Sequence, residues 1–311
     1  MKLSLVVPCY NEAENVAAFQ AAVISAFENC GYAYEIVFVD DGSRDATLHN
    51  LKKLHAEQAC PVKIVSFSRN FGKEAALYAG MQHASGDYIS LIDADLQQRP
   101  EIVRQMVETL DKDRNIDVVA AYQDRRGEGK ILSFFKRCFY SIINKLSDVK
   151  LRADASDFRT FRKSVRDSIL QLNEYHRFSK GLFSWVGFET AYIPYTACAR
   201  TAGKTKWSFR KLVNYAVDGI IGFSTKPLRI ATYLGVLTGF AALIYLVSVV
   251  LEKLIAGIDI PGYATIIVLI LFLGGVQLFC IGIIGEYVGK NFEQSKQRPV
   301  YIAKEILDYE K

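Results

Sequence analysis

Two long apolar runs in the last third of this 311-residue chain constrain its fold more than any other feature. They cover Ile230–Leu251 and Tyr263–Ile284 and contain no formal charge. Each is about 22 residues long, which is enough for a helix to cross a bilayer. The alternative is a pair of buried helices in a soluble protein, and two such lengths in tandem argue against it. We therefore expect a hairpin of two transmembrane helices.

Basic residues lie on the outer flanks of this pair of runs. They are Arg210, Lys211, Lys226, Arg229, Lys290, Lys296 and Arg298. The link between the runs carries only Lys253 against Glu252 and Asp259. By the positive-inside rule, both termini face the cytoplasm and the link faces outward. The sequence thus predicts a multi-pass protein of the plasma (inner) membrane whose N-terminal part is cytoplasmic.

Composition narrows the functional class. The net charge of +5 fits either an ordinary solvated surface or attraction to an anionic membrane face. No arginine-rich arm or zinc-finger spacing suggests a nucleic-acid partner. The six cysteines are scattered without a CxxC pair, which fits free thiols in a reducing cytosol. Met1–Val7 is too short for the apolar region of a signal peptide.

Strand-like and helix-like segments alternate through the N-terminal half. The expected strands are Leu3–Val7, Glu35–Val39, Lys63–Phe67, Tyr88–Ile92 and Asp117–Ala121. The expected helices are Glu14–Glu28, Asp45–Ala56, Lys73–Ala84 and Pro100–Asp111. Most of the strands are continuous apolar runs, as expected when both faces of a sheet are covered. This order predicts an α/β fold with a mostly parallel, Rossmann-like sheet that binds ligands at the carboxyl ends of its strands.

Polar side chains follow each of the first four expected strands. They are Asn11 and Glu12, then Asp40, Asp41, Gly42 and Ser43, then Arg69, Asn70 and Lys73, and finally Asp93 and Asp95. Any one of these clusters could be only a turn or a helix cap. Four clusters at one edge of a sheet favour a binding site.

The fourth cluster, Asp93-Ala94-Asp95-Leu96-Gln97, suggests the chemistry of that site. Two carboxylates one residue apart repel each other, and no basic residue lies close to them in sequence. Mg²⁺ or Mn²⁺ relieves such repulsion, because these cations prefer oxygen ligands and share them with substrate phosphates. The motif therefore predicts a metal-bound diphosphate.

Two further segments are candidate amphipathic helices. Ile131–Leu146 carries an aromatic face with basic flanks, and Lys211–Phe223 leads into the first apolar run. Each suits a membrane surface, although the first could equally face the core. We expect a catalytic domain over residues 1–208, a juxtamembrane helix over 209–229, the hairpin over 230–284 and a cytoplasmic tail over 285–311.

Several motifs, taken in order, resemble one enzyme family. They are Val7-Pro8-Cys9-Tyr10-Asn11-Glu12, Asp40-Asp41-Gly42-Ser43, Asn70-Phe71-Gly72-Lys73, Asp93-Ala94-Asp95-Leu96-Gln97 and Asp157-Phe158-Arg159. Together they resemble inverting glycosyltransferases of family 2 with a GT-A fold. With the two apolar runs, the chain is similar to the polyprenyl-phosphate glycosyltransferases, which include bactoprenol glucosyltransferases and dolichol-phosphate mannose synthases. In that subgroup the aspartate motif often continues as Asp-Pro-Pro-Glu, whereas here Gln98 and Arg99 precede Pro100 and Glu101.

The resemblance implies a role for each motif on the donor side. Pro8, Tyr10, Asn11 and Glu12 would line the nucleotide, with Asp40 accepting hydrogen bonds from base or ribose and Asp41 supporting it. Arg69 and Lys73 would meet the diphosphate. Asp93, Asp95 and Gln97 would hold the cation, with Ala94 between the carboxylates. Asp157 occupies the position usually called the base. We expect Asp157 instead to orient the acceptor phosphate.

The resemblance also implies a lipid-linked phosphate as acceptor. Cations should dominate its site, with Arg200 and Lys206 as the first candidates and Arg125 or Arg126 next. No Gln-x-x-Arg-Trp motif of processive synthases is present, which favours transfer of a single sugar. The expected reaction moves glucose from UDP-glucose to undecaprenyl phosphate with inversion.

Two alternatives to this reaction remain open at the level of sequence. The donor could be GDP-mannose or another UDP-sugar. The chain could also be a membrane-anchored nucleotide-sugar-binding subunit without turnover. Small residues in the apolar runs, such as Gly235 and Gly239, would permit close helix packing in a homo-oligomer.

Overall fold

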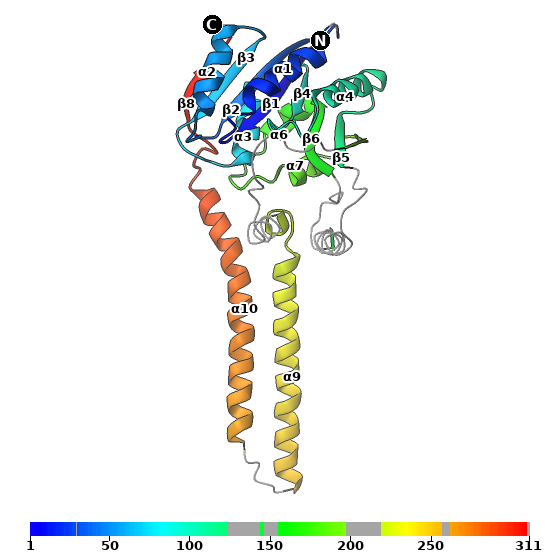
Figure 1. Ribbon diagram of the computed structural model, residues 1–311. Coiled ribbons are helices and arrows are strands. Elements are labelled where there is room, and N and C mark those ends of the chain that lie inside the picture. The colour runs from blue at the N-terminus through cyan, green and yellow to red at the C-terminus, as the bar shows by residue number, and fades with distance from the viewer. Residues whose placement is uncertain (29, 124–143, 146–154, 197–218, 257–261, 310–311) are drawn as a thin grey trace.

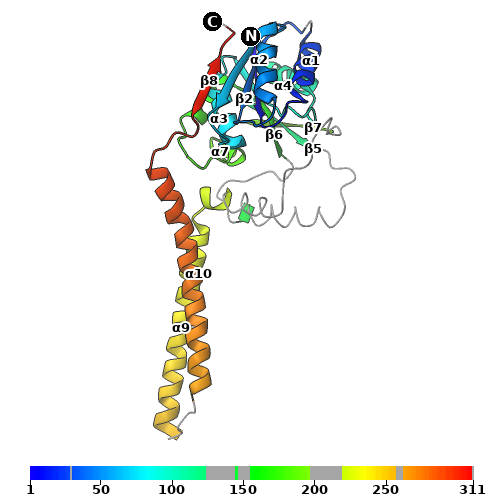
Figure 2. The same cartoon turned by 60° about the vertical axis from the view of Figure 1, so that its left-hand side comes forward.

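The computed structural model of the protein combines an α/β domain with a long helical hairpin that projects from one side of it (Figures 1 and 2). It describes the chain except for residues 29, 124–143, 146–154, 197–218, 257–261 and 310–311. Most of the expected helices Ile131–Leu146 and Lys211–Phe223 lies outside the described residues.

The order of elements matches the expected alternation through the first 123 residues. The strands there are β1 (Lys2–Cys9), β2 (Ala33–Asp40), β3 (Val62–Phe67), β4 (Tyr88–Leu91) and β5 (Val118–Gln123). The helices are α1 (Val16–Phe27), α2 (Thr47–Glu57), α3 (Lys73–His83) and α4 (Pro100–Lys112). Pro100 opens α4, where the missing N–H of proline costs nothing.

Five further elements, all in the α/β domain, were not expected from the sequence. They are β6 (Ala155–Arg162), α6 (Lys163–Leu170), α7 (Ser179–Trp185), β7 (Thr190–Tyr195) and β8 (Ala303–Leu307). Eight strands form one sheet in the order β7-β5-β6-β4-β1-β2-β3-β8. β1 pairs in parallel with β2 and β4, and β2 pairs in parallel with β3, whereas β6 and β8 run antiparallel to their neighbours. The expectation of a mostly parallel α/β fold is confirmed.

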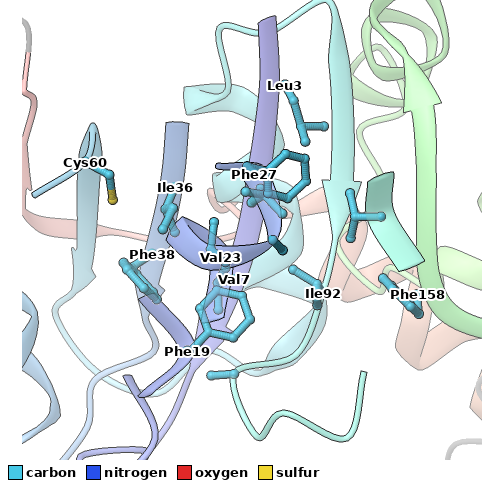
Figure 3. Close-up of a cluster of buried hydrophobic side chains, with 14 of the residues drawn as sticks. Leu3, Val7, Phe19, Val23, Phe27, Ile36, Phe38, Cys60, Ile92 and Phe158 are labelled. Atoms are coloured by element: carbon cyan, nitrogen blue, oxygen red, sulfur yellow. The ribbon is translucent and has the colours of Figure 1, made fainter. Parts of the chain in front are cut away.

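Apolar side chains on both faces of the sheet explain the continuous apolar strands. On one face, Val7, Phe38 and Ile92 pack with Phe19 of α1 in the largest buried cluster (Figure 3). Phe19 and Phe38 meet edge to face with ring centroids 6.0 Å apart. On the other face, α3 packs so closely on β1 that a Cβ added to Gly80 would lie 2.2 Å from Val6 Cγ1. The core therefore fixes the loops that leave the carboxyl ends of β1 to β4.

The hairpin consists of α9 (Lys226–Ala256) and α10 (Tyr263–Ser295), which run side by side (Figure 1). The stretches Lys226–Glu252 and Thr265–Ser295 are long and apolar enough to cross a membrane, and their most apolar windows are not buried by the rest of the chain. Both chain ends lie on the domain, at the side away from the hairpin (Figures 1 and 2).

The C-terminal segment joins the sheet instead of forming a separate tail. The expected boundary at residue 284 falls within α10, and β8 pairs antiparallel with the edge strand β3. Tyr301 stacks on Phe67 with centroids 4.8 Å apart, and the Ser68 N–H donates to Ile302 O over 3.0 Å. The chain therefore leaves the hairpin and is fastened next to β3, whose loop carries Arg69.

A buried carboxylate links this C-terminal segment to the first strands. Glu35 Oε2 lies 3.2 Å from Lys2 Nζ and accepts a hydrogen bond of 2.7 Å from Tyr309. Its Oε1 accepts from Ser4 Oγ at 2.5 Å and from the Ser85 N–H at 2.7 Å. Burial opposes ionisation of Glu35, but these donors prevail and lower its pKa to about 2.

We predict that Glu35→Gln destabilises the protein at neutral pH by about 3 kcal/mol, because a lowering from 4.5 to about 2 corresponds to roughly that much. A lowered pKa stabilises the fold above 4.5, and this contribution is lost as the pH falls toward 2. The difference between wild type and variant in urea unfolding of the detergent-solubilised protein should therefore shrink over that range. Glu57→Gln, on exposed α2, is the control and should cost little. A pH-independent difference would contradict this account.

Candidate active site

The loops after β1 and β2 are tied to each other at the carboxyl edge of the sheet. The Asn11 N–H donates to Ser43 Oγ over 3.0 Å, and Asn11 Oδ1 accepts from the Arg44 N–H over 2.9 Å. Asn11 has a φ of 54°, a left-handed conformation that asparagine tolerates well. The Glu12 N–H donates to Thr47 Oγ1 over 2.8 Å. Pro8, Tyr10, Asn11 and Glu12 thus lie at one rim next to Asp40.

The two aspartates after β2 have different surroundings. Asp40 is buried, and its carboxylate accepts from the Ser43 N–H at 3.2 Å and from Ser66 Oγ at 3.0 Å. Asp41 instead accepts from the N–H groups of Phe71, at 2.6 Å, and Gly72, at 3.0 Å. Burial raises the pKa of Asp41 to about 6 even though these donors oppose the rise. Asp41 therefore fastens the loop after β3.

This fastening brings the loop after β3 against the loop after β2. Gly42 has a φ of 63°, and a Cβ there would lie 2.5 Å from the Arg69 carbonyl carbon. The Arg69 guanidinium lies 4.0 Å from the ring centroid of Phe71 and donates to Asn70 O over 2.9 Å. Arg69 is therefore held at the rim next to the first residues of α3.

Lys73 joins two carboxylates at the centre of the site. Its ammonium lies 2.6 Å from Asp93 Oδ1 and 3.7 Å from Asp157 Oδ2. Partial desolvation by the surrounding chain would lower the pKa of Lys73, but the two carboxylates outweigh it and raise the pKa above its usual value. Asp157 comes from β6, which pairs with β4, and Asp93 lies just beyond the end of β4, so this pairing brings the two carboxylates close together. Lys73 thus contacts the expected cation ligand and the expected acceptor-side residue at the same time.

Asp157 keeps one oxygen available. Its Oδ1 is buried and has no hydrogen-bond partner among the described residues. Burial would raise the pKa of Asp157, but the positive charges of Lys180, Lys73 and Arg159 lower it. Asp157 is therefore an ionised group at neutral pH, which fits an orienting or cation-binding role.

The loop after β4 presents Asp93 and Asp95. Gln98, which is buried, accepts the Asp93 N–H over 3.0 Å, and Asp95 Oδ1 accepts the Gln97 N–H over 3.2 Å. Ala94 is buried, and Leu96 turns the loop with a φ of 57°. Gln98 thus shapes this loop, a role that the sequence analysis missed.

The donor set fits a Mg²⁺ or Mn²⁺ ion shared with substrate. Asp93 and Asp95 supply hard oxygen ligands, and the Asp93 side chain is 35% exposed. Within the described ranges, no group of three or more His, Cys, Asp or Glu residues could hold a metal by itself. The protein ligands would therefore need to be completed by diphosphate oxygens and water, as is usual for Mg²⁺.

Glu74 and Ser179 are two further residues at the site that the sequence analysis missed. Glu74 Oε2 accepts the Ser179 N–H over 2.9 Å and also the Ser179 hydroxyl. Burial, with the charge of Asp157, raises the pKa of Glu74 to about 7. Glu74 adjoins Lys73 in sequence, and a charged pair in the first turn of a helix at this edge was the available signal. Ser179 begins α7, for which no periodicity was visible.

The expected acceptor cations belong to segments outside the described part of the chain. They are Arg125, Arg126, Arg200 and Lys206. Their roles stay predictions.

Comparison with known proteins identifies the family. Residues 4–170 match Glycosyl transferase family 2, and residues 226–290 match the GtrB C-terminal hairpin. This chain belongs to glycosyl transferase family 2. The family match covers β1 to α6, and the hairpin match covers α9 and most of α10.

Curated relatives cover almost the whole chain. The putative glycosyltransferase CsbB of Bacillus subtilis is 41% identical over 97% of this chain and 91% of its own length. The bactoprenol glucosyl transferase of Shigella phage SfV is 41% identical over 98% of both chains. A crystal structure of glucosyl-3-phosphoglycerate synthase from Mycobacterium tuberculosis, in complex with Mn²⁺, uridine-diphosphate and phosphoglyceric acid, is 19% identical over 71% of this chain and 76% of that one, with a TM-score of 0.48.

We predict that Lys73→Met lowers the rate of glycosyl transfer by about two orders of magnitude or more, because Asp93 and Asp157 then lose the cation between them. Lys73→Arg keeps the charge and should retain part of the activity. Lys53→Met, on the exposed side of α2, is the control. Near-normal turnover of Lys73→Met, measured with the preferred donor, would show that the bridge is dispensable.

Proposed function

We propose that this glycosyltransferase moves a single sugar, glucose from UDP-glucose, to a polyprenyl phosphate such as undecaprenyl phosphate. The observation that carries the proposal is the position of the Lys73–Asp93–Asp157 cluster, which is connected through α7 to the residues that enter the apolar hairpin. A polyprenyl chain cannot leave a bilayer cheaply, at about 0.8 kcal/mol per CH₂, so the enzyme must meet its acceptor at the membrane.

The named relatives support glucose and bactoprenol as the first substrates to test. Several of them are bactoprenol glucosyl transferases that match nearly full length. Asp40 would bind the nucleoside, with Tyr10 and Glu12 beside it, and Arg69 would meet the diphosphate. Asp93 and Asp95 would hold a divalent cation, with Gln97 beside them.

A bound cation would neutralise charge on the departing nucleoside diphosphate. A phosphate monoester has a second pKa near 6, so the acceptor is already mostly dianionic at neutral pH and needs no general base. Its oxygen forms a bond to the anomeric carbon while the bond to the diphosphate oxygen breaks, and that electron pair leaves with UDP. Direct displacement inverts the anomeric centre and gives a β-linked product from an α-linked donor.

The residues around Asp157 would then reduce the electrostatic repulsion between the two anionic substrates. An acceptor dianion approaching an anionic donor is repelled, so fixed cations and positioning become the main catalytic contributions. Lys73, which lies between the donor-side Asp93 and Asp157, would offset part of this repulsion. Arg200 and Lys206, with Arg125 or Arg126, would add cations on the acceptor side.

The proposed location is the cytoplasmic face of the plasma membrane. In this arrangement α9 and α10 cross the bilayer, both termini are cytoplasmic and the link between the helices faces outward. The basic flanks of the hairpin support this orientation.

The test is transfer of label to undecaprenyl phosphate from UDP-glucose, UDP-galactose, UDP-N-acetylglucosamine and GDP-mannose, with Mg²⁺, Mn²⁺ or EDTA. We expect labelling from UDP-glucose alone, abolished by EDTA, with a β-linkage in the product. Labelling from a different donor would replace the sugar. Nucleotide binding without transfer from any donor would contradict the enzymatic proposal and support a binding subunit.

A further inference from the structure

We propose that Lys180, at the start of α7, binds the phosphate group of the lipid acceptor. This inference rests on the proposed function and deepens its acceptor site. It starts from three sets of observations: the contacts of α7 with α3, its contacts with the entry to the hairpin, and the charges around Asp157.

The first set fixes the start of α7 to the catalytic centre. Both the N–H and the hydroxyl of Ser179 donate to Glu74 Oε2, and Glu74 directly follows Lys73. Two donors on one carboxylate oxygen leave the first turn of α7 little freedom to slide along α3. Lys180 is the next residue, so its main chain is fixed with respect to Lys73 and Asp157.

The second set fixes α7 to the hairpin entry. Phe178 and Phe223 meet with ring centroids 6.1 Å apart, and a Cβ on Gly181 would lie 2.5 Å from Phe223 Cε2. Phe223 comes three residues before α9 begins at Lys226. Accordingly, α7 lies at the margin of the domain from which the hairpin projects (Figures 1 and 2). A lipid headgroup at the membrane surface would reach Asp157 along this side.

The third set concerns charge. The positive charges of Lys180, Lys73 and Arg159 lower the pKa of Asp157; the charge of Lys180 has the largest single effect among them, and Lys73 adds a hydrogen bond. Arg159 is buried with its guanidinium 4.2 Å from the Phe183 ring centroid, and Lys73 is bound to Asp93. Lys180 is partly exposed, and among the described residues its ammonium takes part in no ion pair. It is therefore the cation beside Asp157 that can turn to an incoming phosphate.

The ligand chemistry is a phosphate monoester dianion. A lysine ammonium is a compact charge with three donors and binds phosphate well. Asp157 beside it would repel the dianion unless this cation were present. Lys180 would therefore hold the attacking phosphate oxygen near the anomeric carbon while Lys73 stays on the donor side.

The test is equilibrium binding of radiolabelled undecaprenyl phosphate to the full-length protein in detergent, without any sugar nucleotide. We expect Lys180→Met to weaken binding by about tenfold or more, the effect of one charged hydrogen bond. Lys180→Arg should retain most of the affinity, and Lys163→Met, on the exposed first residue of α6, should match wild type. Ser179→Ala, which loosens the contact with Glu74, should fall between wild type and Lys180→Met.

Two comparison ligands isolate the phosphate and its source. Undecaprenol, which lacks the phosphate, should bind wild type and Lys180→Met equally. Inorganic phosphate should compete only weakly if the lipid headgroup is the ligand, and strongly if a free phosphate occupies the site.

Equal binding of undecaprenyl phosphate by wild type and Lys180→Met would overturn the inference, as would a wild type that does not bind this lipid. The expected binding pattern together with no transfer from UDP-glucose would instead contradict the proposed function and leave the phosphate site in place.

Discussion

The repulsion between Asp93 and Asp157, relieved by Lys73, organises the centre of this protein. Asp157 lies in β6 and Asp93 lies just beyond β4, and the antiparallel pairing of these two strands brings the carboxylates close together whatever their charge. Lys73 lies within 4 Å of both because α3 begins there, after a loop that Asp41 holds by its backbone N–H groups. A cation and an anionic diphosphate entering this cluster would redistribute the same contacts. The ion pairs at the centre of the site are thus ones whose partners a bound cation and diphosphate could replace.

The hairpin and the domain are joined at two separate places. At the entry, Phe223 packs against α7, which is bound to Glu74 beside Lys73. At the exit, the N–H of Tyr175 donates to Gln294 of α10, and the following chain adds β8 to the sheet. Two attachments restrict rotation of the domain about the hairpin more than one would. In the proposed function, they would keep the acceptor side of the site facing the bilayer surface.

The sequence predicted the elements that can be recognised from local patterns of apolar and polar residues. Continuous apolar strands, helix periodicity and the polar clusters located β1 to β5, α1 to α4 and the carboxyl edge that carries Asp40 and Asp93. β6 was not predicted because Ser156, Asp157 and Arg159 interrupt its apolar pattern. The pattern is interrupted because this strand contributes to the site. β8 was not predicted because it is a five-residue edge strand with two adjacent charged residues, Lys304 and Glu305. Its pairing with β3 depends on contacts between residues distant in sequence.

The sequence predicted which residues belong to the site better than it predicted which of them contact one another. The motif aspartates and Lys73 lie together, but no local signal indicated that Lys73 would bind Asp93 directly or that Gln98 would support that loop. Lys180 lies in a short helix with no visible periodicity, and its relation to Asp157 arises only from tertiary packing. Such residues become visible only when α3, β6 and α7 are seen together.

The most direct test of this account is an experimental structure of the full chain with UDP and Mn²⁺, with the metal located by its anomalous scattering. The account predicts Mn²⁺ bound by Asp93 and Asp95 and by diphosphate oxygens, with the Lys73 ammonium moved from Asp93 to the diphosphate and still close to Asp157. Mn²⁺ at another site, or Lys73 still within hydrogen-bond distance of Asp93 with the diphosphate bound elsewhere, would contradict it.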